Sequence, residues 1–474
     1  MAKKLSVTAY PGEVFGMPGL EILGTEDLGD KMQIMTRSCE PDRKKCSNCG
    51  KMTLYSNGYT VANFVHTPMH GKPCVIKFQR QRWHCSACGK NEQAANPKFL
   101  EVINQHRFSA PLTQFLNNLC LDRKLVDLRE DTRLSSTTIK RYSDARIDYF
   151  DKNLKFPVPV MLGLDEVKIG GQFRTTITNL ERRTLVELLK DRKGEYLKQK
   201  LADMWSDPER ETVLFACTDM YRPFENPLKE LFPNAKWVID KWHVVKEANL
   251  SLEELRKVVQ ADPTFNAHFN ALALKKTVRW LLLKRRHNLV GDDLKFVMTY
   301  LKIFSPELFV AYGLKEEFFN IYENGAKEEA WYAFEAWRKS IPSDSFFEPF
   351  RKNAETFINH KEAILNHWDS KGLTNAYTEC KNNLIRVTDR GGRGYSFKTL
   401  RGRVLYNSKA LVHGTFLQHC FGAGLSALPE NSKPDNGNNP TSSNFDEDAQ
   451  ANPRLYYRGP QDEQDEDDDA NDES

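Results

Sequence analysis

The sequence predicts a multidomain α+β protein, and three observations predict it. Two Cys-x-x-Cys pairs near the N-terminus indicate a small metal-binding module. Between residues 153 and 250, short apolar runs suited to strands alternate with amphipathic helices. A long stretch of helical periodicity, residues 251–368, follows them. A chain of 474 residues is also too long for one ordinary core, so several domains are expected.

Charge is distributed unevenly along the chain. The net charge is +4, but residues 425–474 carry 14 acids against three bases. The rest of the chain is therefore basic, which suggests a polyanionic partner. The acidic end is rich in Asn, Pro, Ser and Asp, so we expect a disordered tail over 425–474.

Targeting signals are not evident in the sequence. The N-terminus lacks the apolar run of a signal peptide, and no stretch approaches the roughly 20 apolar residues of a membrane helix. Ten cysteines without a secretory signal favour metal ligands over disulfides. We therefore expect a cytoplasmic protein without a membrane partner.

The first predicted domain, residues 41–100, follows an N-terminal arm of residues 1–40 and resembles a zinc ribbon. Each Cys-x-x-Cys pair is followed by glycine, which permits the left-handed turn that lets both sulfurs reach one ion. Four thiolates make a closed, structural Zn²⁺ site. Alternatives are a redox pair, or His84 or Cys74 as substitute ligands. The predicted ligands are Cys46, Cys49, Cys85 and Cys88.

A helix-turn-helix is predicted within residues 101–152, as a DNA-binding domain. Its apolar seam consists of Leu125, Leu128, Leu134, Ile139 and Tyr142. A serine at 135 or 136 is a suitable N-cap for the second helix. A plain three-helix module is the alternative. The side chains expected to face DNA are those of Ser136, Thr137, Lys140 and Arg141.

The catalytic domain is expected over residues 153–250 and 369–424. Strands are predicted over 162–167, 173–179, 184–189, 212–217 and 235–240, with helices at 195–205 and 227–231. Three antiparallel strands followed by helix, strand, helix and strand is the order of the ribonuclease-H-like fold.

Acidic residues sit at the ends of two of these strands. In the expected order the first and fourth strands are neighbours, which brings Asp165 and Asp219 together. Buried carboxylates need a positive partner, and Mg²⁺ prefers oxygen ligands. Alternatively, Asp165 ends its strand facing water.

The predicted all-helical insertion, residues 251–368, contains a dense basic cluster. A solvated helix face and a DNA contact are the two interpretations of this cluster. Its members are Lys275, Lys276, Arg279, Lys284, Arg285, Arg286 and His287.

Polar residues at helical spacing follow the insertion. Glu379, Asn382, Asn383 and Arg386 share one helix face, which suits a third metal-binding carboxylate flanked by phosphate-binding residues. The glycine-rich segment after it supplies charge and an aromatic ring for DNA. Its predicted DNA-binding residues are Arg390, Arg393 and Tyr395.

With these motifs, the chain from about Cys46 to His413 resembles the DDE insertion-sequence transposases of the ISL3 family. The resemblance implies a catalytic triad of Asp165, Asp219 and Glu379 that binds two Mg²⁺ or Mn²⁺ ions. Asp240 also ends a strand and is the alternative second acid. Asp219 is preferred because its strand is expected to pair with the first. Asp240 and His243 are then expected to support the site or contact DNA.

The resemblance also implies a reaction and its partners. The enzyme would bind the terminal inverted repeats of an insertion sequence as double-stranded DNA, cleave them, and join the freed 3′-OH to target DNA. Pairing two ends requires a homodimer or larger assembly, located at the bacterial nucleoid when bound. A catalytically inactive, domesticated regulator and a nuclease without strand transfer are the alternatives.

Overall fold

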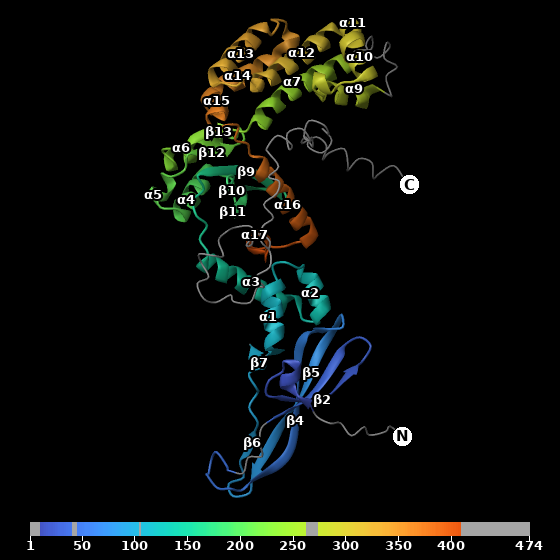
Figure 1. The fold of residues 1–474 in the computed structure, drawn as a ribbon, viewed down its shortest axis with the longest axis vertical. Helices are drawn as coiled ribbons and strands as arrows, with labels where there is room; N and C mark the ends of the chain where they lie inside the picture. The colour runs from blue at the N-terminus through green and yellow to red at the C-terminus, as the bar shows by residue number, and fades with distance from the viewer. Residues whose placement is uncertain (1–9, 40–44, 104–105, 262–273, 409–474) are drawn as a thin grey trace. The chain divides into compact units, whose positions relative to one another are not determined.

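The computed structural model describes residues 10–39, 45–103, 106–261 and 274–408, without the side chains of 274–277. By their contacts the described residues form two compact units. One runs up to Phe156 and resumes at Asn383, and the other is Pro157–Asn382 (Figure 1). The predicted acidic tail lies outside the described residues.

A β-sheet in the order β1-β2-β3-β5-β4-β8-β7, with β6 paired to β5, dominates the first unit. Its longest element is the β4–β5 hairpin, which turns at His70 and Gly71, both with positive φ (Figure 1). A core that includes Leu20, Phe64 and Phe78 holds the sheet together. The strands are β1 (Tyr10–Pro11), β2 (Leu20–Asp27), β3 (Met32–Ser38), β4 (Leu54–Met69), β5 (Lys72–Cys85), β6 (Asn91–Gln93), β7 (Leu100–Ile103) and β8 (His106–Ser109).

The segment expected to be an N-terminal arm contributes strands to this sheet. β3 pairs in parallel with β5, and β2 pairs with β3. Ile22 and Ile34 are buried in the same core as Phe64, so apolar burial fixes the segment in place. β7 and β8 likewise extend the sheet past residue 100, the expected end of the domain.

Three helices follow the sheet, joined by a short turn between the second and third. Arg133 is left-handed in this turn, and the Ser135 hydroxyl accepts a hydrogen bond from the Thr138 amide, so Ser135 caps the third helix. Leu128 and Ile139 are fully buried, as the predicted apolar seam requires. The helices are α1 (Ala110–Leu119), α2 (Leu125–Thr132) and α3 (Ser136–Asn153).

A C-terminal helix, α17 (Phe397–Tyr406), packs on α3. Gly402 permits this close approach, because a Cβ there would lie 2.3 Å from the Ile147 side chain. Asp151 accepts hydrogen bonds from Arg401 and Tyr406. Residues 383–408, expected in the catalytic domain, therefore group by their contacts with the first unit.

The second unit contains a five-stranded sheet in the order β11-β10-β9-β12-β13. β9 pairs antiparallel with β10 and parallel with β12, so the first and fourth strands are neighbours, as expected. Leu162, Leu164 and Val167 of β9 are fully buried. The elements are β9 (Met161–Ile169), β10 (Gln172–Asn179), β11 (Thr184–Leu189), α4 (Gly194–Met204), α5 (Asp207–Arg210), β12 (Phe215–Thr218), α6 (Glu225–Leu231) and β13 (Lys236–Ile239).

Helices account for most of the remainder of this unit. Phe334 and Phe357 stack at 3.9 Å between ring centroids, with Phe318 edge-on to Phe357. No helix among the described residues is long and apolar enough to span a membrane. The helices are α7 (Lys241–Ala261), α9 (Leu274–Leu283), α10 (Gly291–Lys295), α11 (Lys302–Phe304), α12 (Pro306–Asn320), α13 (Lys327–Ser340), α14 (Glu348–Asn359), α15 (Lys361–Asp369) and α16 (Ala376–Gly392), which crosses the boundary between the units.

Candidate functional site

The β4–β5 hairpin brings the two cysteine pairs together. One pair precedes β4 and the other follows β5, and Leu54 lies opposite Cys85 in the register. The four Sγ atoms lie within 4.8 Å of one another. The many residues that separate the two cysteine pairs in sequence therefore form the two long strands of the hairpin.

The geometry of the cysteine cluster fits Zn²⁺. Cys46 and Cys88 have their Sγ atoms 3.7 Å apart, as do Cys49 and Cys85. With Zn–S bonds of about 2.3 Å, a regular tetrahedron has edges of about 3.8 Å. Gly50 and Gly89 adopt positive φ and donate to the carbonyls of Cys46 and Cys85, so both turns have the same form. We conclude that this is a closed, structural zinc site.

Asp165 is the most buried of the three acids of the predicted triad. It lies on β9 with 5% of its surface exposed. Burial, followed by the charges of Glu379 and Asp219, raises the pKa of Asp165 well above its usual value. The Asn382 amide donates to its Oδ2 at 2.9 Å, and the Glu166 amide donates to its Oδ1 at 2.8 Å. Asp165 is thus held in place by neutral donors while two other acids repel its charge.

Asp219 follows β12 and comes beside Asp165. Cys217 is registered with Gly163, and continuing that register by two residues sets Asp219 next to Asp165. Burial raises the pKa of Asp219, while the charges of His243, Arg192 and Lys246 oppose the rise. The positive charges that act on Asp219 therefore come from two segments of the unit, α7 and the loop before α4.

Glu379 completes the group from an exposed position on α16. Its charge acts on Asp165 strongly enough to raise the pKa of that residue. Within the described part of the chain, only the cysteines gather as closely as 4.8 Å, so the three carboxylates are more widely spaced. The structure thus brings Asp165, Asp219 and Glu379 into one acidic group that is more open than the zinc site.

Packing of α16 on the sheet depends on a glycine and on polar contacts. A Cβ at Gly163 would lie 2.4 Å from the Thr178 hydroxyl and 2.7 Å from that of Thr378. These two hydroxyls hydrogen-bond at 2.6 Å, and Asn375 donates to the Leu164 carbonyl at 2.8 Å. Small and polar residues therefore set how closely α16, which carries Glu379, packs on β9.

Asp240, the alternative second acid, is engaged elsewhere. Its Oδ1 accepts from the Trp242 amide at 2.9 Å, and its Oδ2 accepts from the Asn375 amide at 2.7 Å. One carboxylate thus caps the start of α7 and holds the segment before α16. His243, one turn into α7, acts electrostatically on Asp219. The supporting role of Asp240 and His243 stays a prediction.

Glu166 and Arg192 form an ion pair that the sequence analysis did not identify. Arg192 Nη1 donates to Glu166 Oε2 at 2.6 Å. Burial raises the pKa of Glu166, as it does that of Asp165, and the ion pair with Arg192 offsets part of this rise. The only sequence signal was an acid following Asp165, because Arg192 lies in a separate loop whose proximity depends on the β10–β11 hairpin.

The predicted DNA-binding residues divide into exposed and internal ones. All four in α3 are exposed: Ser136, Thr137, Lys140 and Arg141. Arg390 and Arg393 are exposed as well. Arg386 is half-buried and donates to the exposed Asn383 at 2.8 Å.

One of these predictions is corrected by burial. Asn382 has no exposed surface, accepts from Thr176 at 2.6 Å and donates to Asp165, so it positions an acid and does not lie on a surface open to DNA. Tyr395 is half-buried, and a Cβ at Gly392 would lie 2.1 Å from its ring, so the glycine leaves room for this ring. Its contact with DNA stays a prediction.

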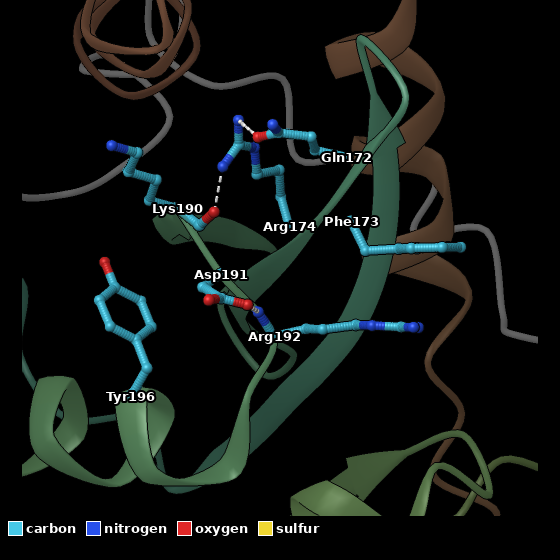
Figure 2. Close-up of a pocket in the computed structure, with 7 residues that line it drawn as sticks. All are labelled: Gln172, Phe173, Arg174, Lys190, Asp191, Arg192 and Tyr196. Atoms are coloured by element: carbon cyan, nitrogen blue, oxygen red, sulfur yellow. Dashed lines mark hydrogen bonds between the residues drawn. The ribbon is translucent and has the colours of Figure 1, made fainter.

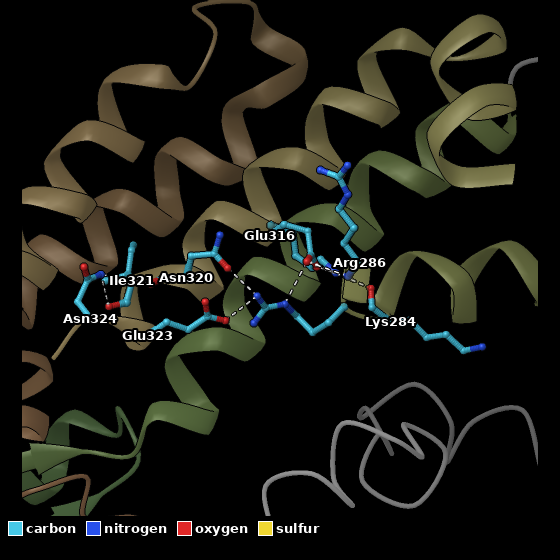
Figure 3. A network of polar contacts seen from close by, with 9 residues as sticks. Lys284, Arg286, Glu316, Asn320, Ile321, Glu323 and Asn324 are labelled. Carbon is cyan, nitrogen blue, oxygen red and sulfur yellow. Dashed lines mark hydrogen bonds and ion pairs between the residues drawn. The ribbon is translucent and has the colours of Figure 1, made fainter. Parts of the chain in front are cut away.

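The basic cluster of the insertion is partly paired internally. Arg285 is 7% exposed and contacts Glu316 at 3.1 Å, Asn320 at 2.6 Å and Glu323 at 3.0 Å. Figure 3 shows these three partners close to one another. Lys284 pairs with Asp293 at 3.1 Å. Arg286 and His287 remain exposed, while the side chains of Lys275 and Lys276 lie outside the description. The cluster is therefore partly a structural network that fixes the loop after α9.

A zinc module and an open acidic site beside two parallel strands define the class: a multidomain α+β protein with one structural and one candidate catalytic centre. A transposase model of the ISL3 group, for the DDE domain, matches residues 162–404. The zinc finger of transposases IS204/IS1001/IS1096/IS1165 matches residues 42–88. The first match covers just over half of the chain, so the chain belongs to the ISL3 family of transposases. A search of curated proteins found no match. Membership of this family implies DNA binding.

Proposed function

We propose that this protein is a DDE transposase that cleaves the ends of an insertion sequence and transfers the freed strands to target DNA. The catalytic domain would be ribonuclease-H-like, in keeping with the strand order β11-β10-β9-β12-β13. The observation that carries the proposal is the buried Asp165 carboxylate, whose pKa is raised by burial, Glu379 and Asp219.

The pairing of the nearby acids indicates which residues would hold metal. Glu166 forms an ion pair with Arg192, and the Asp240 carboxylate accepts hydrogen bonds from two backbone amides. Burial raises the pKa values of Asp165, Asp219 and Glu166, and Arg192 already offsets part of this rise at Glu166. A divalent cation would do the same at Asp165 and Asp219. On the proposed function, Asp165, Asp219 and Glu379 would hold two Mg²⁺ or Mn²⁺ ions. Bound there, such ions supply an activated nucleophile and neutralise the leaving oxygen.

Residues of the chain position this group. Asn382 and Asn375 fix β9 relative to α16, and thereby Asp165 relative to Glu379. His243, Arg192 and Lys246 place positive charge around Asp219, where a DNA phosphate would approach.

DNA recognition is assigned to the first unit. We propose that the α2–α3 pair is a helix-turn-helix; a capped second helix whose first two turns expose polar and basic residues supports this. We propose that α3 and the zinc module bind the terminal inverted repeats, and that the protein acts on DNA as a homodimer or larger assembly.

A strand-transfer assay with labelled element ends and a plasmid target tests the proposal. Asp165→Asn and Glu379→Gln should each lower cleavage and joining by more than about 100-fold, since loss of a ligand should exceed the 10–100-fold typical of outer-shell changes. Asp203→Asn and Glu329→Gln, exposed acids on α4 and α13, serve as matched controls within about twofold.

Each alternative predicts a different result. A nuclease gives cleaved ends but no joined products, and an inactive regulator binds DNA without metal-dependent cleavage. Full activity in either Asp165→Asn or Glu379→Gln would refute the assignment of the triad.

A further inference from the structure

A cleft of about 560 Å³ lies beside Glu166, between the start of β10 and the segment that joins β11 to α4. Figure 2 shows Arg174 between Gln172 and Lys190, with Tyr196 projecting from α4. Phe173 and Arg192 also line the cleft. The lining thus combines basic and aromatic side chains that the proposed cleavage chemistry does not use.

Arg192 connects this cleft to the acidic site. Its guanidinium lies 3.9 Å from the ring centroid of Phe173 and 4.9 Å from that of Tyr221, and the Phe173 and Arg192 side chains extend alongside each other in Figure 2. It also pairs with Glu166, and its charge lowers the pKa of Asp219. A ligand in the cleft would therefore lie within electrostatic reach of the acidic group.

Other charged groups of the cleft form hydrogen bonds with neighbouring protein groups. Arg174 donates to the Gln172 side chain at 2.7 Å and to the Lys190 carbonyl. Asp191, the acid in the lining, accepts from the backbone amides of Arg192 and Lys193, so its charge is directed to the start of α4. The positive charges left to face a ligand are the exposed Lys190 ammonium and the edge of Arg192.

Aromatic surface is available in the same cleft. Phe173 is 40% exposed, although its ring belongs to a strand of a buried sheet, and Tyr196 is half-exposed. Aromatic rings beside cations are the pattern by which proteins bind unpaired nucleotides, through stacking of bases and neutralisation of phosphates. The volume is in the range of small-ligand pockets, so the cleft has room for a nucleotide and not for a duplex.

We propose that this cleft binds an unpaired nucleotide of the DNA strand adjoining the acidic site. The base stacks on Phe173 or Tyr196, and Lys190 or Arg192 neutralises the phosphate. The inference rests on the proposed function, because it assigns the cleft to a strand that leaves the reacting duplex.

Binding of the full-length protein to DNA without added divalent ions tests the cleft separately from catalysis. The probes are a blunt duplex of arbitrary sequence and the same duplex with a short single-stranded extension containing 2-aminopurine. The wild type should bind the extended probe about tenfold more tightly and change the 2-aminopurine fluorescence by stacking. Phe173→Leu and Tyr196→Leu, which keep apolar volume, should together abolish that preference. Lys190→Gln should reduce the salt dependence of binding to the extended probe.

Tyr332→Leu, an exposed aromatic residue on α13, is the matched control and should retain the preference. Equal affinity for both probes in the wild type, or an undiminished preference in the Phe173→Leu/Tyr196→Leu protein, would overturn the inference. Thermal denaturation verifies that each variant is folded. If strand transfer is absent but the preference and its loss are observed, the proposed function fails and the nucleotide site stands. If strand transfer is present without a preference, only the cleft assignment fails.

Discussion

The four-cysteine site and the three-carboxylate site are assembled in opposite ways. All four thiols come from the two ends of one hairpin, and their Sγ atoms lie within 4.8 Å of one another. The carboxylates come from β9, the end of β12 and α16, and Asn382, which supports Asp165, is 217 residues away from it in sequence. The first site depends on local turns, and the second depends on packing across the unit.

The two sites also differ in how their charge is accommodated. Around the thiols, Thr53 lies 3.1 Å from Cys85 Sγ, and Glu92 accepts from the Ser47 amide at 2.7 Å, so both turns are braced. Around Asp165, by contrast, burial and two like charges oppose ionisation. A closed, braced site suits a structural metal, and an open site with unfavourable charge suits one that binds a reacting group.

Removal of zinc should have the largest effect and should be local. Chelation, or Cys85→Ser, should abolish hydrogen-exchange protection in β6 and in the adjoining ends of β4 and β5. The apolar cluster there includes only Leu54, Trp83 and Ala94 beside the cysteines, whereas structural zinc contributes about 10–16 kcal/mol in zinc-finger peptides. Hydrogen-exchange mass spectrometry of the full chain measures this.

Cys39→Ser, an exposed cysteine outside the cluster, should leave the pattern unchanged. Protection around Phe64 and Phe78, and in β9–β13, should persist because separate cores hold those strands. Retained protection at β6 after zinc is lost would show that the metal does not stabilise the module.

Neutral substitutions of Asp219 and Asp240 should change the stability of the second unit in opposite directions. Asp240→Ala should destabilise the second unit by about 2–4 kcal/mol, because the amides of Trp242 and Asn375 lose their acceptor. Asp219→Asn should stabilise it at pH 7.5 without added divalent ions, since the folded-state pKa of Asp219 is raised and its ionised form is disfavoured. Urea denaturation measures both.

The pH dependence of the stability change in Asp219→Asn tests whether the charge of Asp219 causes it. A raised folded-state pKa costs stability only above the unfolded value, about 3.9 for Asp, so the gain from Asp219→Asn should shrink as the pH falls from 7.5 to 4.5. A gain that does not change over this range would indicate that it does not come from the charge of Asp219.

Substitutions of the adjacent residues Asn382 and Asn383 should distinguish a residue that positions Asp165 from one that contacts DNA. Their effects should be the smallest of those predicted. Asn382→Ala should lower strand transfer by about 10–100-fold, or about 1.4–2.7 kcal/mol, because Asp165 loses its amide donor. Asn383→Ala, at an exposed position, should instead change DNA affinity with little effect on the rate from the bound state. Single-turnover kinetics at saturating DNA distinguish the two, and equal rate losses would contradict the positioning role.

Local patterns in the sequence were sufficient for several features. The two cysteine pairs predicted the zinc site, since both turns and the intervening strands are contained in one hairpin. The strand and helix order predicted that β9 and β12 are neighbours, because parallel connections follow regular rules. Their spacing of three residues predicted that Glu379 and Asn382 lie within one turn of the same helix, α16.

Other features were not predictable in this way. Spacing cannot distinguish a buried amide from an exposed one on the same helix, so Asn382 was expected to contact DNA although it contacts Asp165. Strands β1–β3 were missed because β3 joins the sheet by pairing with β5, which follows later in the chain, and β2 and β1 are added beside β3. The Glu166–Arg192 pair was missed for the same reason.

The sequence by itself determined which residue types are present and how they are spaced: paired cysteines, acids at strand ends and a polar helix face. Only the tertiary structure decided which carboxylates are matched by other groups. Glu166 is paired with Arg192 and Asp240 with backbone amides, whereas Asp165 is buried beside two further acids. The physical reason is that the energy of a charge depends on its burial and its neighbours, and long-range packing brings those neighbours together.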